Sequence, residues 1–354
     1  MTLSNTLVQT KHQDAVSVLR TYLEQSDEQG SFHIDVYKLA DENQIPRPVM
    51  LAACIKALYE GFLVMEWVFH CPHCGGVPKE TVSLHEATHD DYCPVCKVNF
   101  ANVIDRNIEV FFSLHPGKAP QSKALKERYH NLMREDITQH MHFDWQNPHT
   151  IYAVDVIQHP LYREYFGAET LPQDQSLELM NSTILFTDIK GSTRMYSDLG
   201  DAKAFGLVRE HFRILFECIQ KYNGLPVKTI GDAVMGSFVD GRHAIIAAIE
   251  AQQTLRSYYQ NRPEKERIEV KIGIHSGPTI LVTLNNRLDY FGTTVNLAAR
   301  IQGIAQPNEI ILSENVFAPL EHKTLLRKYV PRVYRSTHTF KGVDGVYQVY
   351  HVRP

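Results

Sequence analysis

Two Cys-x-x-Cys pairs constrain the fold of this chain more than any other feature. Cys71 with Cys74 and Cys93 with Cys96 are separated by 18 residues. Two short turns at this spacing can place four thiolates about 2.3 Å from a tetrahedral Zn²⁺. The pattern therefore predicts a zinc ribbon over residues 71–117, structural because no ligand position stays open for a substrate. Two disulfides or free thiols are the alternative, which a reducing cytosol disfavours.

The regions on either side of this ribbon predict further domains. The 354 residues are enough for at least two hydrophobic cores. Apolar residues at helical spacing, followed by an apolar strand segment, make residues 1–70 similar to a winged-helix module. Residues 118–180 read as a helical connector, loop-rich from about residue 156. Residues 181–354 alternate strand and helix signals and form the largest predicted domain.

Charge argues against nucleic acid as a partner. The chain has 36 Lys and Arg against 40 Asp and Glu, and residues 1–70 hold five basic against nine acidic side chains. A DNA-binding surface needs the opposite sign to neutralise phosphates. We therefore expect the N-terminal module to contact a regulatory protein or a small ligand. The chain has no signal-peptide pattern and no apolar run long enough to span a membrane, so we expect a cytoplasmic protein.

Several polar residues stand where expected strands and helices begin or end. An apolar strand finishes at Asp188, and we expect the loop after it to span Lys190, Gly191, Ser192 and Thr193. A hairpin over residues 226–238 turns at Gly231 and Asp232. Asn296 lies four positions before a basic residue, Arg300, on an expected helix, so the two share one face. Aspartate oxygens suit Mg²⁺ or Mn²⁺.

Five segments make a family resemblance specific: FTDIKGST, VKTIGDAV, GIHSGP, DYFGTTVNLAAR and FKGVDGVYQVY. They occur in the order and spacing of class III nucleotidyl cyclases, which residues 181–354 therefore resemble. The N-terminal region with paired cysteines is similar to that of a soluble bacterial subset. The resemblance implies an α+β fold, a ferredoxin-like α/β sandwich whose sheet is rich in antiparallel strands and packed with helices.

The resemblance also implies roles for the residues near the phosphates. Asp188 and Asp232, with the backbone of Ile189, would hold two Mg²⁺ or Mn²⁺ ions per active site. Further residues would contact the triphosphate: Gly191, Ser192, Thr193 and Lys341. The catalytic pair would be Asn296, which orients the ribose, and Arg300, which stabilises charge on the α-phosphate.

Lys228 and Asp289 correspond to the residues that read the base. Lysine donates to N1 of adenine and aspartate accepts from the exocyclic amine, whereas guanine inverts that pattern. We therefore predict an adenylate cyclase that converts ATP to 3′,5′-cyclic AMP and pyrophosphate. In the family each site lies between two subunits, which implies a homodimer.

Two alternatives stay open. A cyclase of this fold could act on a pyrimidine triphosphate or GTP, since cytosine also offers an amine donor beside a ring acceptor. A zinc-dependent DNA-binding regulator with a vestigial cyclase domain is the other. The sequence identifies neither the general base nor the regulatory input.

Overall fold

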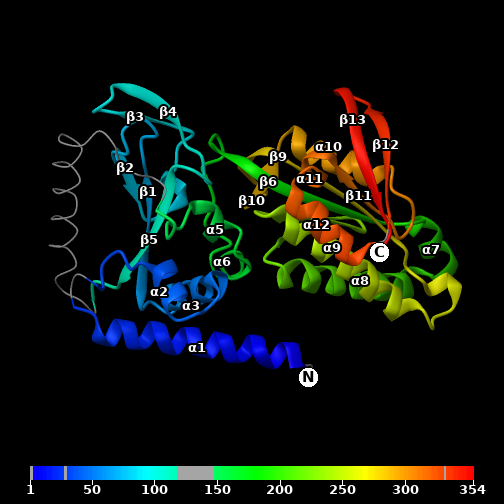
Figure 1. Cartoon of the computed structure of the whole chain (residues 1–354), viewed down its shortest axis with the longest axis horizontal. Coiled ribbons are helices and arrows are strands. Elements are labelled where there is room, and N and C mark those ends of the chain that lie inside the picture. The colour runs from blue at the N-terminus through cyan, green and yellow to red at the C-terminus, as the bar shows by residue number, and fades with distance from the viewer. Residues whose placement is uncertain (1–2, 28–29, 118–146, 331) are drawn as a thin grey trace. The chain divides into compact units, whose positions relative to one another are not determined.

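The computed structural model describes residues 3–27, 30–117, 147–330 and 332–354. The chain forms two compact units (Figure 1). The first comprises Met1–Leu179 and Leu281–Leu288, and the second comprises Met180–Ile280 and Asp289–Pro354. The predicted helical connector lies outside the described residues as far as residue 146. No helix within the described ranges combines the length and apolar character needed to cross a bilayer.

Three helices open the first unit, namely α1 (Leu3–Gln25), α2 (Val36–Glu42) and α3 (Arg47–Tyr59). Asp35 caps α2, because its carboxylate accepts a hydrogen bond from the amide of Lys38 at 3.1 Å. Gly61, with φ of 72°, follows the end of α3, as its sequence position predicts. The order of helices and the strand after them is the expected one, while the winged-helix resemblance stays a prediction.

Short strands complete the first unit. β1 (Leu63–Phe69) lies between β2 (Lys79–Thr81) and β5 (Ile108–Leu114) in an antiparallel sheet, and β3 (Asp90–Cys93) pairs with β4 (Val98–Ala101). Trp67 and Phe112 are fully buried on this sheet. A single-turn 3₁₀ helix, Leu84–Glu86, precedes β3.

Helices also occur just before the second unit, where loops were expected from about residue 156. α5 spans Ala153–Ile157 and α6 spans Pro160–Tyr165. His159 accepts a hydrogen bond from the amide of Leu161 at 3.2 Å and so starts α6, with Pro160 at its first position. Helices of five and six residues are too short to show a clear apolar period.

The segment Leu281–Leu288 belongs to the first unit although strands of the second contain it. It is the hairpin between β9 (Val270–Leu284) and β10 (Arg287–Phe291). Thr283 donates to the carbonyl of Leu171 at 2.7 Å, and Arg163 donates to the carbonyl of Leu288 at 3.0 Å. The division between units therefore runs through strands and not through a flexible linker.

The described part of the second unit is built on an eight-stranded sheet, ordered β12-β13-β11-β9-β6-β8-β7, with β10 paired to β9. The strands not yet given are β6 (Ser176–Ile189), β7 (Leu225–Ile230), β8 (Ala233–Phe238), β11 (Ile310–Ser313), β12 (Val333–Phe340) and β13 (Val343–Val352). β9 and β11 run parallel, whereas β6–β8, β7–β8, β11–β13 and β12–β13 are antiparallel. This mixed sheet with helices confirms the α+β class.

Helices cover both faces of this sheet (Figure 1). They are α7 (Ser192–Leu199), α8 (Asp201–Lys221), α9 (Gly241–Tyr259), α10 (Thr293–Gly303), α11 (Glu314–Phe317) and α12 (Leu320–Tyr329), with a 3₁₀ turn at Glu264–Glu266. Ile310 and Leu312 belong to the large core that α8 and α9 share, whereas Ile311 packs in a separate cluster with α10. Alternate side chains of β11 thus pack on opposite faces of the sheet.

Candidate functional site

Two aspartates meet where the end of β6 lies beside the turn between β7 and β8. β6 pairs with β8 through Phe186 and Met235, and the amide of Val234 donates to the hydroxyl of Thr187 at 3.1 Å. Asp188 follows Thr187 directly, and Asp232 is in the turn just before β8. The sequence predicted both positions, and the antiparallel pairing brings them together.

The electrostatics of this pair fit a cation. Burial raises the pKa of Asp188, the nearby charge of Asp232 raises it further, and Lys271 opposes both effects. The Oδ2 atom of Asp232 is buried, with no hydrogen-bond partner in the described residues. A buried carboxylate oxygen without a partner is costly, and a hard divalent cation satisfies it. The side chains present therefore suit Mg²⁺ or Mn²⁺.

The loop predicted to hold phosphates is shorter than expected. Ile189 ends β6, Lys190 and Gly191 form the turn, and α7 begins at Ser192. Gly191 has φ of 66°, a conformation that glycine adopts without strain. Ser192 and Thr193 therefore lie in the first helical turn, where backbone N–H groups have no partner within the helix. Such a helix start attracts anions.

Lys228 and Asp289 contact each other from β7 and β10. The ammonium of Lys228 forms a hydrogen-bonded ion pair with Oδ2 of Asp289, and the amide of Tyr290 donates to Oδ1 at 2.8 Å. The side chain of Asp289 is 10% exposed, whereas that of Lys228 is 36% exposed. Donor and acceptor thus lie side by side, with the lysine open to solvent.

The remaining predicted residues lie on α10 and at the β12–β13 turn. Asn296 is exposed and Arg300 is half-buried one turn later. A Cβ atom built on Gly342 would lie 3.6 Å from Nη2 of Arg300, so the guanidinium reaches the turn that carries the exposed Lys341. In the part of the chain that the structure describes, no hydrogen bond or ion pair joins these three residues to Asp188 or Asp232.

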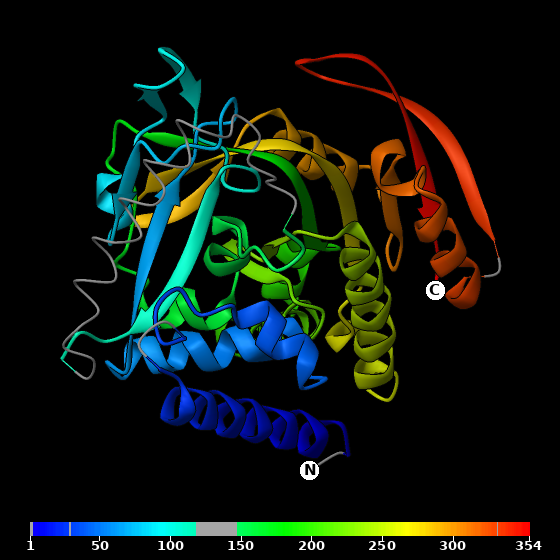
Figure 2. The ribbon, with the colours of Figure 1, turned by 60° about the vertical axis from the view of Figure 1, so that its left-hand side comes forward.

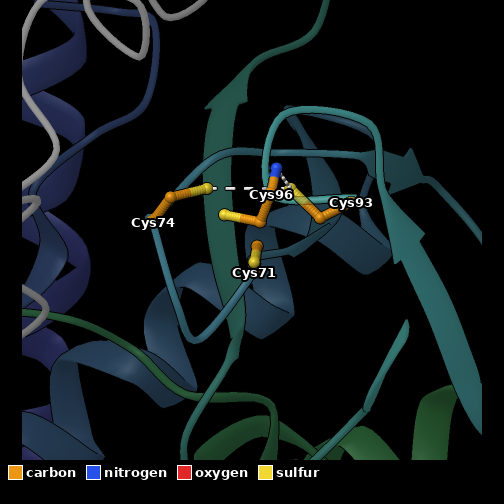
Figure 3. A group of neighbouring side chains, drawn as sticks. All are labelled: Cys71, Cys74, Cys93 and Cys96. Carbon is orange, nitrogen blue, oxygen red and sulfur yellow. Dashed lines mark hydrogen bonds between the residues drawn. The ribbon is translucent and has the colours of Figure 1, made fainter. Parts of the chain in front are cut away.

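A cluster of four cysteines occupies the first unit. The sulfur atoms of Cys71, Cys74, Cys93 and Cys96 all lie within 4.8 Å of one another (Figure 3). They are free thiols and not disulfides. Burial is the largest effect on Cys74 and raises the pKa of its thiol to about 11. Because a cation is needed to keep four such groups deprotonated together, the cluster fits a thiolate-binding metal such as Zn²⁺.

Each half of this cluster is shaped by the same backbone turn. Gly75 follows the first Cys-x-x-Cys pair with φ of 76°, and Lys97 follows the second with φ of 57°. The amide of Gly75 donates to the carbonyl of Cys71 at 2.8 Å, and the amide of Lys97 donates to the carbonyl of Cys93, also at 2.8 Å. In each cysteine knuckle, meaning a Cys-x-x-Cys pair with its turn, the residue directly after the second cysteine therefore has a left-handed backbone.

Both parts of the chain are similar to known families. Residues 175–351 match the family described as adenylate and guanylate cyclase catalytic domain. The chain belongs to this family. Residues 1–131 of the same chain match a family of unknown function (DUF5939).

Curated cyclases are similar to this chain over about half of its length. An adenylate cyclase of Anabaena cylindrica is 31% identical over 185 residues, which cover 48% of this chain and 36% of that protein. An adenylate cyclase of Lachancea kluyveri is 29% identical over 186 residues, which cover 47% of this chain and 10% of that protein. A solved structure from Silicibacter pomeroyi, titled adenylate/guanylate cyclase/hydrolase, is 25% identical with a TM-score of 0.44 and covers 51% of this chain and 99% of that one. The chain thus spans about a third or less of the length of these two curated relatives.

The cyclase unit places one further charged group beside the aspartates. Lys271, on β9, lies with Nζ 3.6 Å from Oδ2 of Asp188. Sequence reasoning missed it, because a lysine on a strand is most often a solvated side chain. Its position depends on β9 and β6 being neighbours in the sheet, which no local motif reveals.

Proposed function

We propose that this protein is an adenylate cyclase, converting ATP to 3′,5′-cyclic AMP and pyrophosphate. The observation that carries the proposal is the pair Asp188 and Asp232, with a buried unsatisfied oxygen, inside a unit of the cyclase family. A vestigial domain would have no need to keep two carboxylates close together against their mutual repulsion.

The chain's residues would divide the work on the triphosphate. Asp188, Asp232 and the carbonyl of Ile189 hold the metals. Bound Mg²⁺ or Mn²⁺ supplies positive charge that lowers the pKa of the ribose 3′-hydroxyl and offsets charge on the phosphates. The amides of Gly191, Ser192 and Thr193 donate to the β- and γ-phosphates at the start of α7.

Three further residues would act closer to the reacting atoms or to the leaving group. Asn296 orients the ribose so that its 3′-oxygen points at the α-phosphorus. Arg300 stabilises the negative charge that gathers on the α-phosphate. Lys341, on the turn beside the Arg300 guanidinium, contacts the triphosphate.

Base selection would rest on the contact between Lys228 and Asp289. When the two residues separate, adenine can bind both at once, because it presents an acceptor to the lysine and a donor to the aspartate. Guanine would leave the buried Asp289 facing an oxygen, and a mispaired buried polar group discriminates strongly. The two curated relatives named above are adenylate cyclases, which supports the same choice.

Assembly and regulation belong to this proposal too. We propose a homodimer in which the aspartates of one copy face Asn296 and Arg300 of the other, so that each dimer holds two sites. The cysteine cluster would hold a structural Zn²⁺ in an N-terminal regulatory region. We also propose a cytoplasmic location, because cysteines without disulfides fit a reducing compartment.

The test is a product assay with the four nucleoside triphosphates. Purified protein is incubated with Mn²⁺ and each triphosphate, and we expect cyclic AMP as the main product. Asp232→Asn should lower the rate at least a hundred-fold, since it removes a metal-binding charge. Asp198→Asn, which changes an exposed aspartate of α7, is the matched control and should keep the activity. Cyclic GMP, CMP or UMP as the main product would overturn the adenylate assignment.

A further inference from the structure

At the β12–β13 hairpin, two imidazoles converge on one hydroxyl. Oγ of Ser336 lies 2.8 Å from Nε2 of His338 and 2.6 Å from Nε2 of His351. Ser336 is opposite Val349 in the antiparallel pairing, and His351 is opposite Tyr334, so the three polar side chains share one face of the hairpin. Figure 2 shows this long hairpin in orange and red.

A buried carboxylate holds the ring of His351 from the other side. Oε1 of Glu309 lies 3.3 Å from Nδ1 of His351, and the side chain of Glu309 is 4% exposed. Its Oε2 accepts from the amide of Gln306 at 2.8 Å, and Nε of Arg353 lies 3.2 Å from Oε1. These contacts hold the carboxylate in place, and because its oxygen accepts, the ring donates from Nδ1 and keeps a lone pair on Nε2.

This is the arrangement by which proteins prepare a histidine for a metal. A carboxylate that accepts from one ring nitrogen fixes the tautomer and makes the other nitrogen a better ligand. The second imidazole reaches the same point from two positions along β12, and the side chain of His351 is 21% exposed, open to an entering ion. The hydroxyl between them carries one proton and can donate to only one of the two rings.

We propose that His338 and His351 bind a divalent transition-metal ion, with Zn²⁺ as the probe, through their Nε2 atoms. Glu309 is a positioning residue that orients His351. His338 changes tautomer to present its lone pair, and Ser336 either remains beside the ion or turns away. Imidazole nitrogen suits Zn²⁺, Cu²⁺ and Ni²⁺ better than Mg²⁺, so this site is chemically different from the aspartate pair.

Ser336, His351 and Glu309 also have the order of a nucleophilic triad. A triad needs one imidazole on its hydroxyl, whereas here a second ring points at the same oxygen. Ser336 moreover lies in the middle of a paired strand and not on a sharp turn. The convergence of two nitrogen ligands is what a metal requires, and therefore we favour binding of a metal.

The test counts metal ions bound by the full chain. Protein loaded with zinc and freed of excess is titrated with Zn²⁺ by calorimetry, with the metal content checked by elemental analysis. We expect one ion retained by the cysteine cluster and a second equivalent bound in the titration. His338→Ala and His351→Ala should each weaken the second equivalent at least ten-fold, and Glu309→Gln should weaken it ten- to a hundred-fold.

Two variants separate this site from others. Cys93→Ser should lose the first ion and keep the second, while His243→Ala, a histidine of α9 outside the group, should keep both.

Ser336→Ala should still bind the second ion, because both imidazoles remain, and a fluorophosphonate should leave Ser336 unlabelled. A second equivalent unchanged in both histidine variants, no second equivalent in the unaltered protein, or labelling of Ser336 would overturn the proposal.

Discussion

Two buried histidines, His211 and His275, give the cyclase unit the acid sensitivity that we expect of it. His211 lies on α8, is fully buried, and neither ring nitrogen has a hydrogen-bond partner in the described residues. Burial lowers its pKa from 6.5 to about 3. Folding therefore keeps the ring neutral at a pH where the unfolded chain would protonate it.

We expect His211 to lower the free energy of unfolding of the protein in mild acid. The stabilising effect is complete above pH 6.5 and is lost as the pH falls toward 3, because only the unfolded state takes up the proton. Between pH 7.5 and pH 5 the loss from His211 is about 2 kcal/mol. Urea unfolding at both pH values measures it, and His211→Leu should remove that part. His275, whose pKa burial lowers to about 4, remains in both proteins as the internal reference. Equal pH dependence in the two proteins would contradict the prediction.

At the scale of helices and strands, local signals predicted ends and turns well. Asn223, with φ of 56°, follows α8, and Gly231, with φ of 63°, starts the turn that carries Asp232. Both follow from residues that tolerate left-handed backbone. The prediction placed Ser192 and Thr193 in the loop, which was wrong, because only the finished turn at Gly191 shows where α7 begins.

Contacts across the sheet were beyond the reach of local patterns. The ion pair between Lys228 and Asp289 joins residues 61 positions apart, and it depends on where β7 and β10 lie. Family resemblance named both residues but said nothing of their contact. The group around Ser336 had no motif at all, since its members come together only through the register of β12 with β13 and the position of Glu309 before β11.

The cysteine knuckles support a prediction about their turns. Lys97 is exposed and holds φ of 57°, where Gly75 holds φ of 76° in the other knuckle. Lys97→Gly should stabilise the first unit by about 1 kcal/mol, and Gly75→Ala should destabilise it by about the same amount. Thermal unfolding of zinc-loaded protein measures both. Lys97→Ala removes the same side chain but keeps a Cβ atom, so this control should give no gain in stability. A gain as large as that of Lys97→Gly would show that the backbone turn is not the cause.

At the scale of the whole molecule, the proposed shared sites predict complementation between inactive chains. Asp232→Ala and Asn296→Ala proteins should each be inactive alone, because every site lacks one essential group. When the two proteins are mixed in equal amounts and exchange subunits, half of the dimers contain one chain of each kind. Each mixed dimer has one complete site out of two. Activity should therefore return to about a quarter of the unaltered level.

A second mixture is the control for that experiment. Asp188→Ala with Asp232→Ala should stay inactive, since both changes fall on the same half of the site. Native mass spectrometry confirms that mixed dimers have formed. Mixed dimers without recovered activity would refute the shared-site arrangement.

The chain crosses between its two units three times, inside β6, β9 and β10. A genetic exchange at one breakpoint cannot replace the first unit cleanly. A hybrid joined at Met180 would keep Leu281–Leu288, a piece of the unit that had been replaced. Recombination that preserves folding has to move that hairpin together with residues 1–179. We therefore expect the two segments to be inherited together, although they are separated in the sequence.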